Sequence, residues 1–291
     1  KIYDYMDIGY GTSGSCNNNV VCHTDWSTES DGVVQILLST GTELCSGSML
    51  NNTNQDYRPF IVTAFHCIDT GKNFVLEQNE INEAQEWLVR FRFRHKYCTN
   101  SAYIFDDVIT YDDTQFRAAW NGSDGSDFAL VELQDCIAGD TYNRVTWLGW
   151  DRSNNTPTSG AGIHHPSGDV MKISFSNTSP TIDGNFWRYQ FYDGVVEGGS
   201  SGSPIFNANK RIVGQLLGTP SADPISCNNQ DGFAIYWRFN LSWTGDSTNT
   251  TRLSNWLDSE NTGAMTLNTI RGPFISGADL VCTSGASFVV S

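Results

Sequence analysis

Apolar residues in this chain come in short runs separated by turn-forming residues, and this pattern constrains the fold more than any other feature. The runs are rich in β-branched and aromatic side chains, and the chain holds 27 glycines together with abundant Ser, Thr and Asn. Such a pattern favours many short strands joined by turns. Helical spacing stands out in residues 251–258, where Leu253, Trp256 and Leu257 share one face. With 291 residues available to bury a core, the sequence predicts an all-β fold with a short C-terminal helix.

One Gly-rich stretch, residues 197–204, has the composition of a loop that presents a nucleophile. Ser201 follows Gly199 and Ser200 there and directly precedes Gly202. Small neighbours let the backbone turn sharply and let a substrate carbonyl approach, while nearby N–H groups can bind an oxyanion. Taken alone, the stretch is equally typical of a linker.

Two further segments supply the partners that a nucleophilic serine needs. Residues 61–67 form an apolar strand pattern that ends in His66 beside a cysteine, and Asp127 opens an alternating strand pattern at residues 126–133. A hydroxyl is inert near neutral pH until a base removes its proton, and imidazole titrates in the required range. A carboxylate behind the imidazole fixes its tautomer and stabilises the imidazolium. The order His66, Asp127, Ser201 is that of the chymotrypsin-type proteases, so these residues are the candidate catalytic triad.

Segments spread over residues 11–264 resemble the bacterial secreted lysyl endopeptidases, a branch of the chymotrypsin-like (trypsin-like) serine proteases. The matching segments are residues 14–22, 63–67, 126–128, 149–152, 163–166, 198–204, 213–216, 242–245 and 252–258. The resemblance implies a protease domain of two antiparallel six-stranded β-barrels, which we place at residues 1–271. It also implies peptide-bond hydrolysis through an acyl-enzyme, without a cofactor. The oxyanion would then lie between the backbone N–H groups of Gly199 and Ser201.

The residue before the candidate nucleophile differs from that of the digestive enzymes of this superfamily. Those enzymes pair a newly freed N-terminal ammonium with an aspartate at this position, whereas this chain has Ser200. A buried ammonium would have no charged partner there. We therefore expect residues 1–16 to be held by disulfides instead, and maturation to use another route. The resemblance also implies that a signal peptide and a propeptide were removed ahead of Lys1.

Eight cysteines, none in a Cys-x-x-Cys pair, fit an oxidising compartment better than a zinc site. Spacing alone allows 105 pairings of eight cysteines. The resemblance implies the bridges Cys45–Cys67, Cys16–Cys227 and Cys22–Cys98. We pair the remaining Cys136 and Cys282 by elimination. The alternative is that Cys282 is free or belongs to another module, because residues 272–291 resemble the start of a secreted immunoglobulin-like module.

The candidate substrate pocket lies around the nucleophile. Its lining residues, by the same resemblance, are Val195, Glu197, Leu217, Gly218 and Ala234. In the lysyl endopeptidases a carboxylate at the pocket floor lies two residues before a tyrosine, and the matching residue here is Ala234. Because a methyl group cannot pair with an ammonium, we expect specificity for uncharged residues. The alternative is a Lys/Arg-specific enzyme in which Asp231 or Glu197 supplies the negative charge.

Charge and hydropathy argue against several partners. A formal net charge of −15 argues against nucleic-acid binding, which needs a basic field. Residues 90–96 mix basic and aromatic residues, and as a strand they would bury Phe91 and Phe93 and leave the arginines solvated. No apolar run approaches a membrane span. His164 and His165 lack acidic or cysteine partners at ligand spacing, so we assign them to strand or loop structure and expect no metal.

The hypothesis that unites these features is a monomeric, secreted bacterial endopeptidase acting on proteins or peptides, or one held at the cell surface through a C-terminal module since removed. An inactive homologue serving as a binding module is the main alternative, although such relatives usually lose a triad member. An α/β-hydrolase esterase would need Gly-x-Ser-x-Gly with its histidine after the serine. No histidine follows Ser201, which argues against this class.

Overall fold

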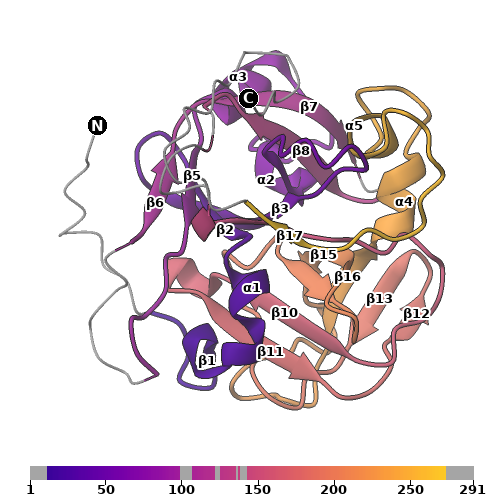
Figure 1. The fold of residues 1–291 in the computed structure, drawn as a ribbon. Helices are drawn as coiled ribbons and strands as arrows, with labels where there is room; N and C mark the ends of the chain where they lie inside the picture. Colours follow the sequence, from indigo (N-terminus) through magenta and orange to yellow (C-terminus); the bar gives the residue numbers. More distant parts are fainter. Residues whose placement is uncertain (1–11, 99–106, 122–124, 136, 138–142, 273–291) are drawn as a thin grey trace.

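Two curled antiparallel sheets build the molecule, one above the other in Figure 1. The computed structural model describes residues 12–98, 107–121, 125–135, 137 and 143–272. The first sheet has the strand order β6-β5-β2-β3-β4-β8-β7. Its strands are β2 (Val33–Leu37), β3 (Glu43–Leu50), β4 (Phe60–Ala64), β5 (Leu88–Phe91), β6 (Ile109–Tyr111), β7 (Thr114–Trp120) and β8 (Phe128–Leu133).

The second sheet has the order β1-β11-β10-β14-β15-β16-β13-β12. Its strands are β1 (Asn18–Asn19), β10 (Gly160–His164), β11 (Lys172–Ser176), β12 (Thr181–Asp183), β13 (Phe186–Tyr189), β14 (Pro204–Phe206), β15 (Ile212–Gly218) and β16 (Ala234–Arg238). A separate pair, β9 (Thr146–Trp147) and β17 (Ile270–Arg271), joins the linker between the sheets to the end of the described chain. The domain boundary expected near residue 271 stays a prediction.

The all-β prediction with two antiparallel halves is confirmed. Six strands were expected in each half, and within the described residues the sheets hold seven and eight. The additional strands β6, β1 and β12 are two or three residues long and lie at sheet edges. They lengthen the two sheets without changing the order of the other strands.

Three apolar clusters fill the interior. One lies within the first sheet and includes Ile61 and Trp87, and another lies within the second sheet and includes Tyr189. The third joins side chains of both sheets, among them Phe128 from the first and Phe206 from the second. Burial of side chains of this size stabilises a fold by about 1.5–3 kcal/mol each. The shared cluster therefore holds the two sheets in contact. Beside it, the loop that carries Gly202 contacts the end of β4.

Helices are short and lie at the ends of strands. They are α1 (Ser27–Ser30), α2 (Phe65–Ile68), α3 (Gln78–Gln85), α4 (Phe239–Thr244) and α5 (Ser254–Leu257), with 3₁₀ turns η1 (Val20–Cys22), η2 (Thr24–Trp26) and η4 (Pro166–Gly168). The expected C-terminal helix is α5, with Leu253 and Leu257 buried beneath it and Trp256 packed against the same core. The described helices include none with the length and apolar character that crossing a membrane requires.

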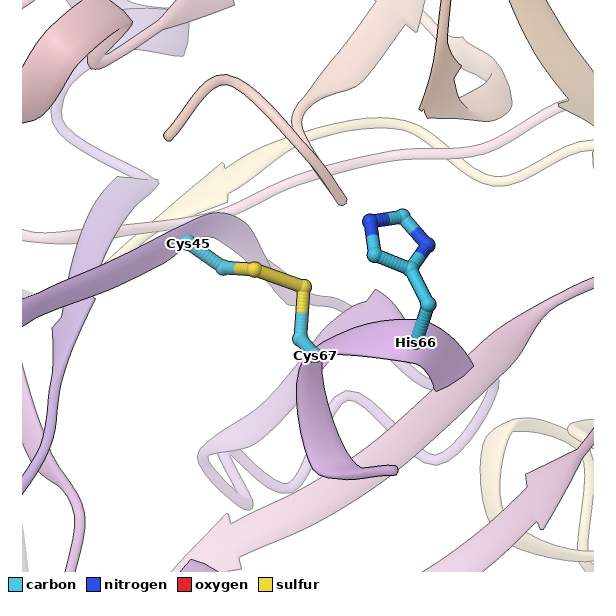
Figure 2. Close-up of side chains that lie close together, drawn as sticks. All are labelled: Cys45, His66 and Cys67. Carbon is cyan, nitrogen blue, oxygen red and sulfur yellow. A yellow bond between two sulfur atoms is a disulfide. The ribbon is translucent and has the colours of Figure 1, made fainter. Parts of the chain in front are cut away.

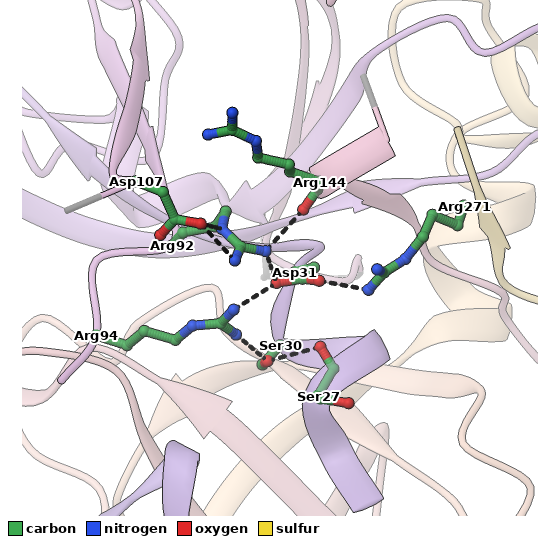
Figure 3. A network of polar contacts seen from close by, with 8 residues as sticks. All are labelled: Ser27, Ser30, Asp31, Arg92, Arg94, Asp107, Arg144 and Arg271. Atoms are coloured by element: carbon green, nitrogen blue, oxygen red, sulfur yellow. Dashed lines mark hydrogen bonds and ion pairs between the residues drawn. The ribbon is translucent and has the colours of Figure 1, made fainter. Parts of the chain in front are cut away.

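The prediction of a solvated basic face at residues 90–96 is wrong. Strand β5 ends at Phe91 because Arg92 has a positive φ of 60°, which breaks the alternation. Arg92 and Arg94 are buried and pair with the buried carboxylate of Asp31, as Figure 3 shows. The Arg94 Nη2 to Asp31 Oδ1 distance is 2.8 Å. A third arginine, Arg271, donates to the other oxygen of Asp31, so three arginines surround this one carboxylate.

Three of the four expected disulfides are present, Cys16–Cys227, Cys22–Cys98 and Cys45–Cys67. The first ties the N-terminal segment to the second sheet across 211 residues of sequence. That bridge confirms the expectation that a disulfide holds the leader, for the part of it that is described. Cys136 and Cys282 lie outside the described residues, so their pairing stays a prediction.

The cysteine pairing can be tested by mass. We expect alkylation of the unreduced protein to label no thiol, and peptide mapping to join Cys136 to Cys282. Reduction should lower the free energy of unfolding by several kcal/mol, because native bridges contribute about 2–5 kcal/mol each. A reactive thiol at Cys282 in the unreduced protein would contradict the pairing by elimination.

Candidate active site

His66 and Asp127 are brought together by the register of two paired strands. Strand β4 ends at Ala64, opposite Phe128, the first residue of β8. His66 therefore stands in the first turn of α2 beside Asp127, which directly precedes β8. Asp127 Oδ2 lies 2.9 Å from His66 Nδ1, and Asp127 Oδ1 accepts the His66 backbone N–H at 2.9 Å. The two oxygens fix both the backbone and the ring of His66.

This pair has the burial that a catalytic base and its orienting carboxylate need. The Asp127 side chain is 6% exposed, whereas that of His66 is 37% exposed. The carboxylate is thus shielded while the ring reaches solvent. When Nδ1–H donates to Asp127, Nε2 is left free to accept a proton from a hydroxyl. The arrangement can therefore support general-base chemistry at Nε2.

A second-sheet residue, Gln215, holds the loop that carries Asp127. Gln215 lies on β15, and its Nε2 donates to the backbone carbonyl of Ser126 and to Ser242 Oγ, the latter at 3.2 Å. Gln215 and Ser126 are both fully buried. The position of Asp127 is consequently set by both halves of the fold.

Cys45, His66 and Cys67 also form the one described group of potential metal ligands, drawn in Figure 2. Their ligand atoms lie within 4.8 Å of one another. The two sulfurs, however, are joined in the Cys45–Cys67 bridge, so neither is a thiolate. A disulfide sulfur is not the thiolate that metals bind. The bridge instead anchors α2, and with it His66, to β3.

Ser201 lies in a loop of the second sheet that packs onto the start of α2. Gly202 has φ of 78°, and a Cβ there would approach Ala64 N and Ser46 O to 2.6 Å. Only glycine permits this close approach. The loop carrying Ser201 thus contacts the backbone two residues before His66. Among the described contacts, Ser201 Oγ is not hydrogen-bonded to His66, and such bonds are often long before substrate binds.

The backbone of the Ser201 loop leaves two N–H groups unused. The carbonyl of Gly198 accepts from Ser167 N, and that of Ser200 accepts from Ser203 N at 3.1 Å. In a trans peptide the N–H points away from the preceding carbonyl. The Gly199 and Ser201 N–H groups therefore point away from these anchors. Within the described part of the chain, neither has an acceptor, which is what an oxyanion site requires.

Ser46, on β3, braces the same loop from the first sheet. Its N–H donates to the Ser201 carbonyl at 2.9 Å, and its hydroxyl donates to the Gly199 carbonyl at 2.9 Å. Ser46, Gln215 and Ser167 were missed in the sequence. Each acts through backbone groups far away along the chain, and no local pattern signals such a role.

The candidate pocket residues divide into a buried apolar set and a rim. Val195 and Ala234 are fully buried in the apolar cluster of the second sheet. Leu217 and Gly218, at the end of β15, are half-buried. Ala234 is the first residue of β16.

The two carboxylates proposed as alternative pocket charges lie elsewhere or are engaged. Glu197 Oε1 accepts from Gly14 N at 2.9 Å and from Asn17 Nδ2 at 2.8 Å, and its Oε2 accepts from Ser167 Oγ at 2.7 Å. Its carboxylate holds the N-terminal segment against the Ser201 loop. Asp231 is exposed, in the turn region that precedes β16.

His164 and His165 lie at the end of β10 and in the following loop, as predicted, and both are fully buried. Burial lowers the pKa of His164 to about 3 and that of His165 to about 4, from an ordinary 6.5. Unfolded histidine binds a proton below about 6.5, whereas these folded side chains bind one only below about 4. Their contribution to stability is thus complete above pH 6.5 and declines on acidification toward pH 3.

We expect acidification from pH 6.5 to pH 5 to lower the free energy of unfolding by about 3 kcal/mol through these two histidines. Urea unfolding at the two pH values measures this loss. In His165→Gln the part of this loss that comes from the two histidines should shrink by about half. Other titrating groups contribute equally to both proteins, so the difference between the two losses isolates the contribution of His165. An unchanged loss in that variant would contradict the buried, neutral state of His165.

Comparison with known proteins gives the family. The model of the lysyl endopeptidase C-terminal domain matches residues 10–234, more than half of the chain. A protein named lysyl endopeptidase from Pseudomonas aeruginosa strain PAO1 is 29% identical over 239 residues, which cover 75% of this chain and 48% of that protein. The chain thus spans about half the length of this curated relative.

A solved structure has the same fold at low sequence identity. It is that of a Glu endopeptidase in complex with MPD, with a TM-score of 0.52 and 17% identity, covering 79% of this chain and 93% of the other. At this identity the likeness concerns the fold alone. Taken with the family match, the two curled sheets show that the chain belongs to the lysyl endopeptidase C-terminal domain family and has a chymotrypsin-like fold.

Proposed function

We propose that the chain is a serine endopeptidase in which Ser201 is the nucleophile, His66 the general base and Asp127 the orienting carboxylate. Ser201 Oγ attacks the scissile carbonyl while His66 Nε2 takes its proton. The imidazolium then protonates the leaving amine, and a water activated by the same ring hydrolyses the acyl-enzyme. Asp127, bonded to Nδ1, stabilises the imidazolium in both halves of the reaction.

The observation that carries this proposal is the pair of unused N–H groups at Gly199 and Ser201. They belong to a loop whose carbonyls are held by Ser46 and Ser167, and which packs beside the His66–Asp127 pair. Developing negative charge on the carbonyl oxygen is best stabilised by donors that are already oriented. Removal of one such donor typically costs about 2.7–4 kcal/mol of transition-state stabilisation.

For specificity, we propose an uncharged residue before the scissile bond. The support is apolar burial at Val195 and Ala234 and the engagement of both Glu197 oxygens with other groups. A lysine ammonium placed against Ala234 would lie buried without a partner, which costs several kcal/mol. The relative's name, lysyl endopeptidase, makes Lys/Arg specificity the alternative.

The proposal extends to where the enzyme works and on what. Its substrates would be proteins or peptides, and its location extracellular, because the three bridges favour an oxidising compartment. Cleavage-site profiling on a peptide library tests the activity and its specificity together. We expect cleavage after uncharged residues, absent in Ser201→Ala. Equal cleavage by that variant would contradict the proposed nucleophile.

A further inference from the structure

The residue before the proposed nucleophile, Ser200, is fully buried and uncharged. It faces His164, which is also fully buried and lies at the end of β10. Ser200 Oγ lies 2.8 Å from His164 Nδ1. Neither side chain takes part in the proposed chemical steps, yet Ser200 lies between the two residues with unused N–H groups, and His164 contacts its hydroxyl.

The surrounding contacts determine where each proton in this cluster lies. Ser174 Oγ, on the neighbouring strand β11, donates to the Val195 carbonyl at 2.8 Å. It must therefore accept from His164 Nε2, 3.2 Å away. At the other side, the Glu197 N–H donates to Ser200 Oγ at 3.2 Å. The Ser200 hydrogen is then free to point at His164 Nδ1, which accepts it.

Every polar atom of this chain of bonds has a partner when His164 is neutral and carries its proton on Nε2. The ring stays neutral because burial holds its pKa at about 3. This series of hydrogen bonds begins at the Val195 carbonyl and ends at the Glu197 N–H. Residues 195–200 are thereby tied at both ends to strands β10 and β11, which pair with each other in the register Gly162↔Ser174.

We propose that His164 is a positioning residue: by accepting the Ser200 hydroxyl, it holds the Gly199 and Ser201 N–H groups in the orientation that binds the oxyanion. This inference rests on the proposed serine-protease function. A neutral, fully satisfied network would then do what a charged pair between an N-terminal ammonium and an aspartate does in the digestive enzymes. Because the network lies within the sheet, the loop would be ordered without a freed N-terminus.

Ser200→Ala tests the inference, and Ser203→Ala is its matched control. Ser203 is fully buried in the same loop, but its hydroxyl has no hydrogen-bond partner among the described residues. We expect Ser200→Ala to lower kcat by about 10–100-fold, since loss of one complete oxyanion donor lowers it by about 10²–10³. KM should change less than about threefold, and Ser203→Ala should stay within about twofold in kcat.

A transition-state analogue separates positioning from a general loss of folding. Inhibition by a peptidyl trifluoromethyl ketone, which places an oxyanion in the site, should weaken in Ser200→Ala by the same factor as kcat. Binding of the peptide product should not change. Equal kcat in Ser200→Ala and Ser203→Ala, or parallel losses in product and analogue binding, would overturn the inference.

Substitution of His164 gives a second test should Ser200→Ala fail to fold. In His164→Asn the amide oxygen can replace Nδ1 as the acceptor for Ser200, whereas His164→Leu removes the acceptor. We expect kcat to follow the order wild type, His164→Asn, His164→Leu, and equal kcat in the two variants would overturn the inference. Phosphonate labelling of the wild type at Ser201 distinguishes the two proposals: without it the serine-protease function fails, and with it only the role of His164 is in question.

Discussion

Ser201→Ala and His66→Ala should each lower kcat by about six orders of magnitude while the fold is kept, because the members of a catalytic triad act as a unit. Ser201 is half-buried at a loop surface, and His66 is 37% exposed, so neither truncation removes core packing. Steady-state hydrolysis of a peptide substrate measures the loss, and circular dichroism checks the fold.

The double variant gives a sharper result than either single one. If the Ser201 hydroxyl needs His66 as its base, removal of both should cost little more than removal of one. If the fold-decrease in kcat of the double variant equals the product of the two single decreases, the two residues act independently. Ser203→Ala, which removes a buried hydroxyl from the same loop, serves as the control and should keep its activity.

The second large effect concerns the pocket. We expect Ala234→Asp to raise the ratio of kcat/KM for lysine over apolar substrates by about two to three orders of magnitude. The reason is that the buried ammonium of the substrate lysine gains a carboxylate partner, which Ala234 does not provide. Ala234→Asn is the matched control, since it has the same size and no charge. Competition between two peptides that differ in the residue before the scissile bond measures the ratio.

The same assay decides between the two specificities of the unsubstituted enzyme. Near-exclusive cleavage after Lys or Arg, lost in Asp231→Asn or in Glu197→Gln, would contradict an apolar pocket floored by Ala234. If cleavage after uncharged residues persists in both variants, these carboxylates have no part in specificity. Glu197→Gln should then act only through the groups that the carboxylate binds, which are Gly14 and Asn17 of the N-terminal segment and Ser167.

Much of the fold and part of the site could be predicted from the sequence because their signals are local. Short, mainly apolar runs such as residues 128–133 indicate strands, and β8 is found there with all six of its residues buried. The residue after Ser201 is a glycine because Gly202 lies against the backbone of another strand. His66 and Asp127 are adjacent because β4 pairs with β8. The order of the two residues in the chain, together with the family resemblance, had indicated that they belong to one site.

The failures of the sequence analysis have two causes, which are tertiary pairing of polar groups and the lack of an apolar pattern in a helix. Arg92 and Arg94 were expected in solvent, but they neutralise Asp31, which lies 61 and 63 residues away in the sequence. Helix α3 was missed because it is mostly polar and buries only Glu80 and Ala84. A capping box between Glu77 and Glu80 starts it, and such a motif is weak when no apolar run follows.

Labelling by a peptidyl phosphonate tests the central claim most directly. The reagent bonds covalently to a serine only where a base activates the hydroxyl and donors stabilise the negatively charged oxygen. We predict one adduct per chain, mapped to Ser201, with none in Ser201→Ala or His66→Ala and an unchanged rate in Ser203→Ala. Absence of labelling in the wild type, or an adduct on another residue that accompanies loss of hydrolysis, would contradict the account.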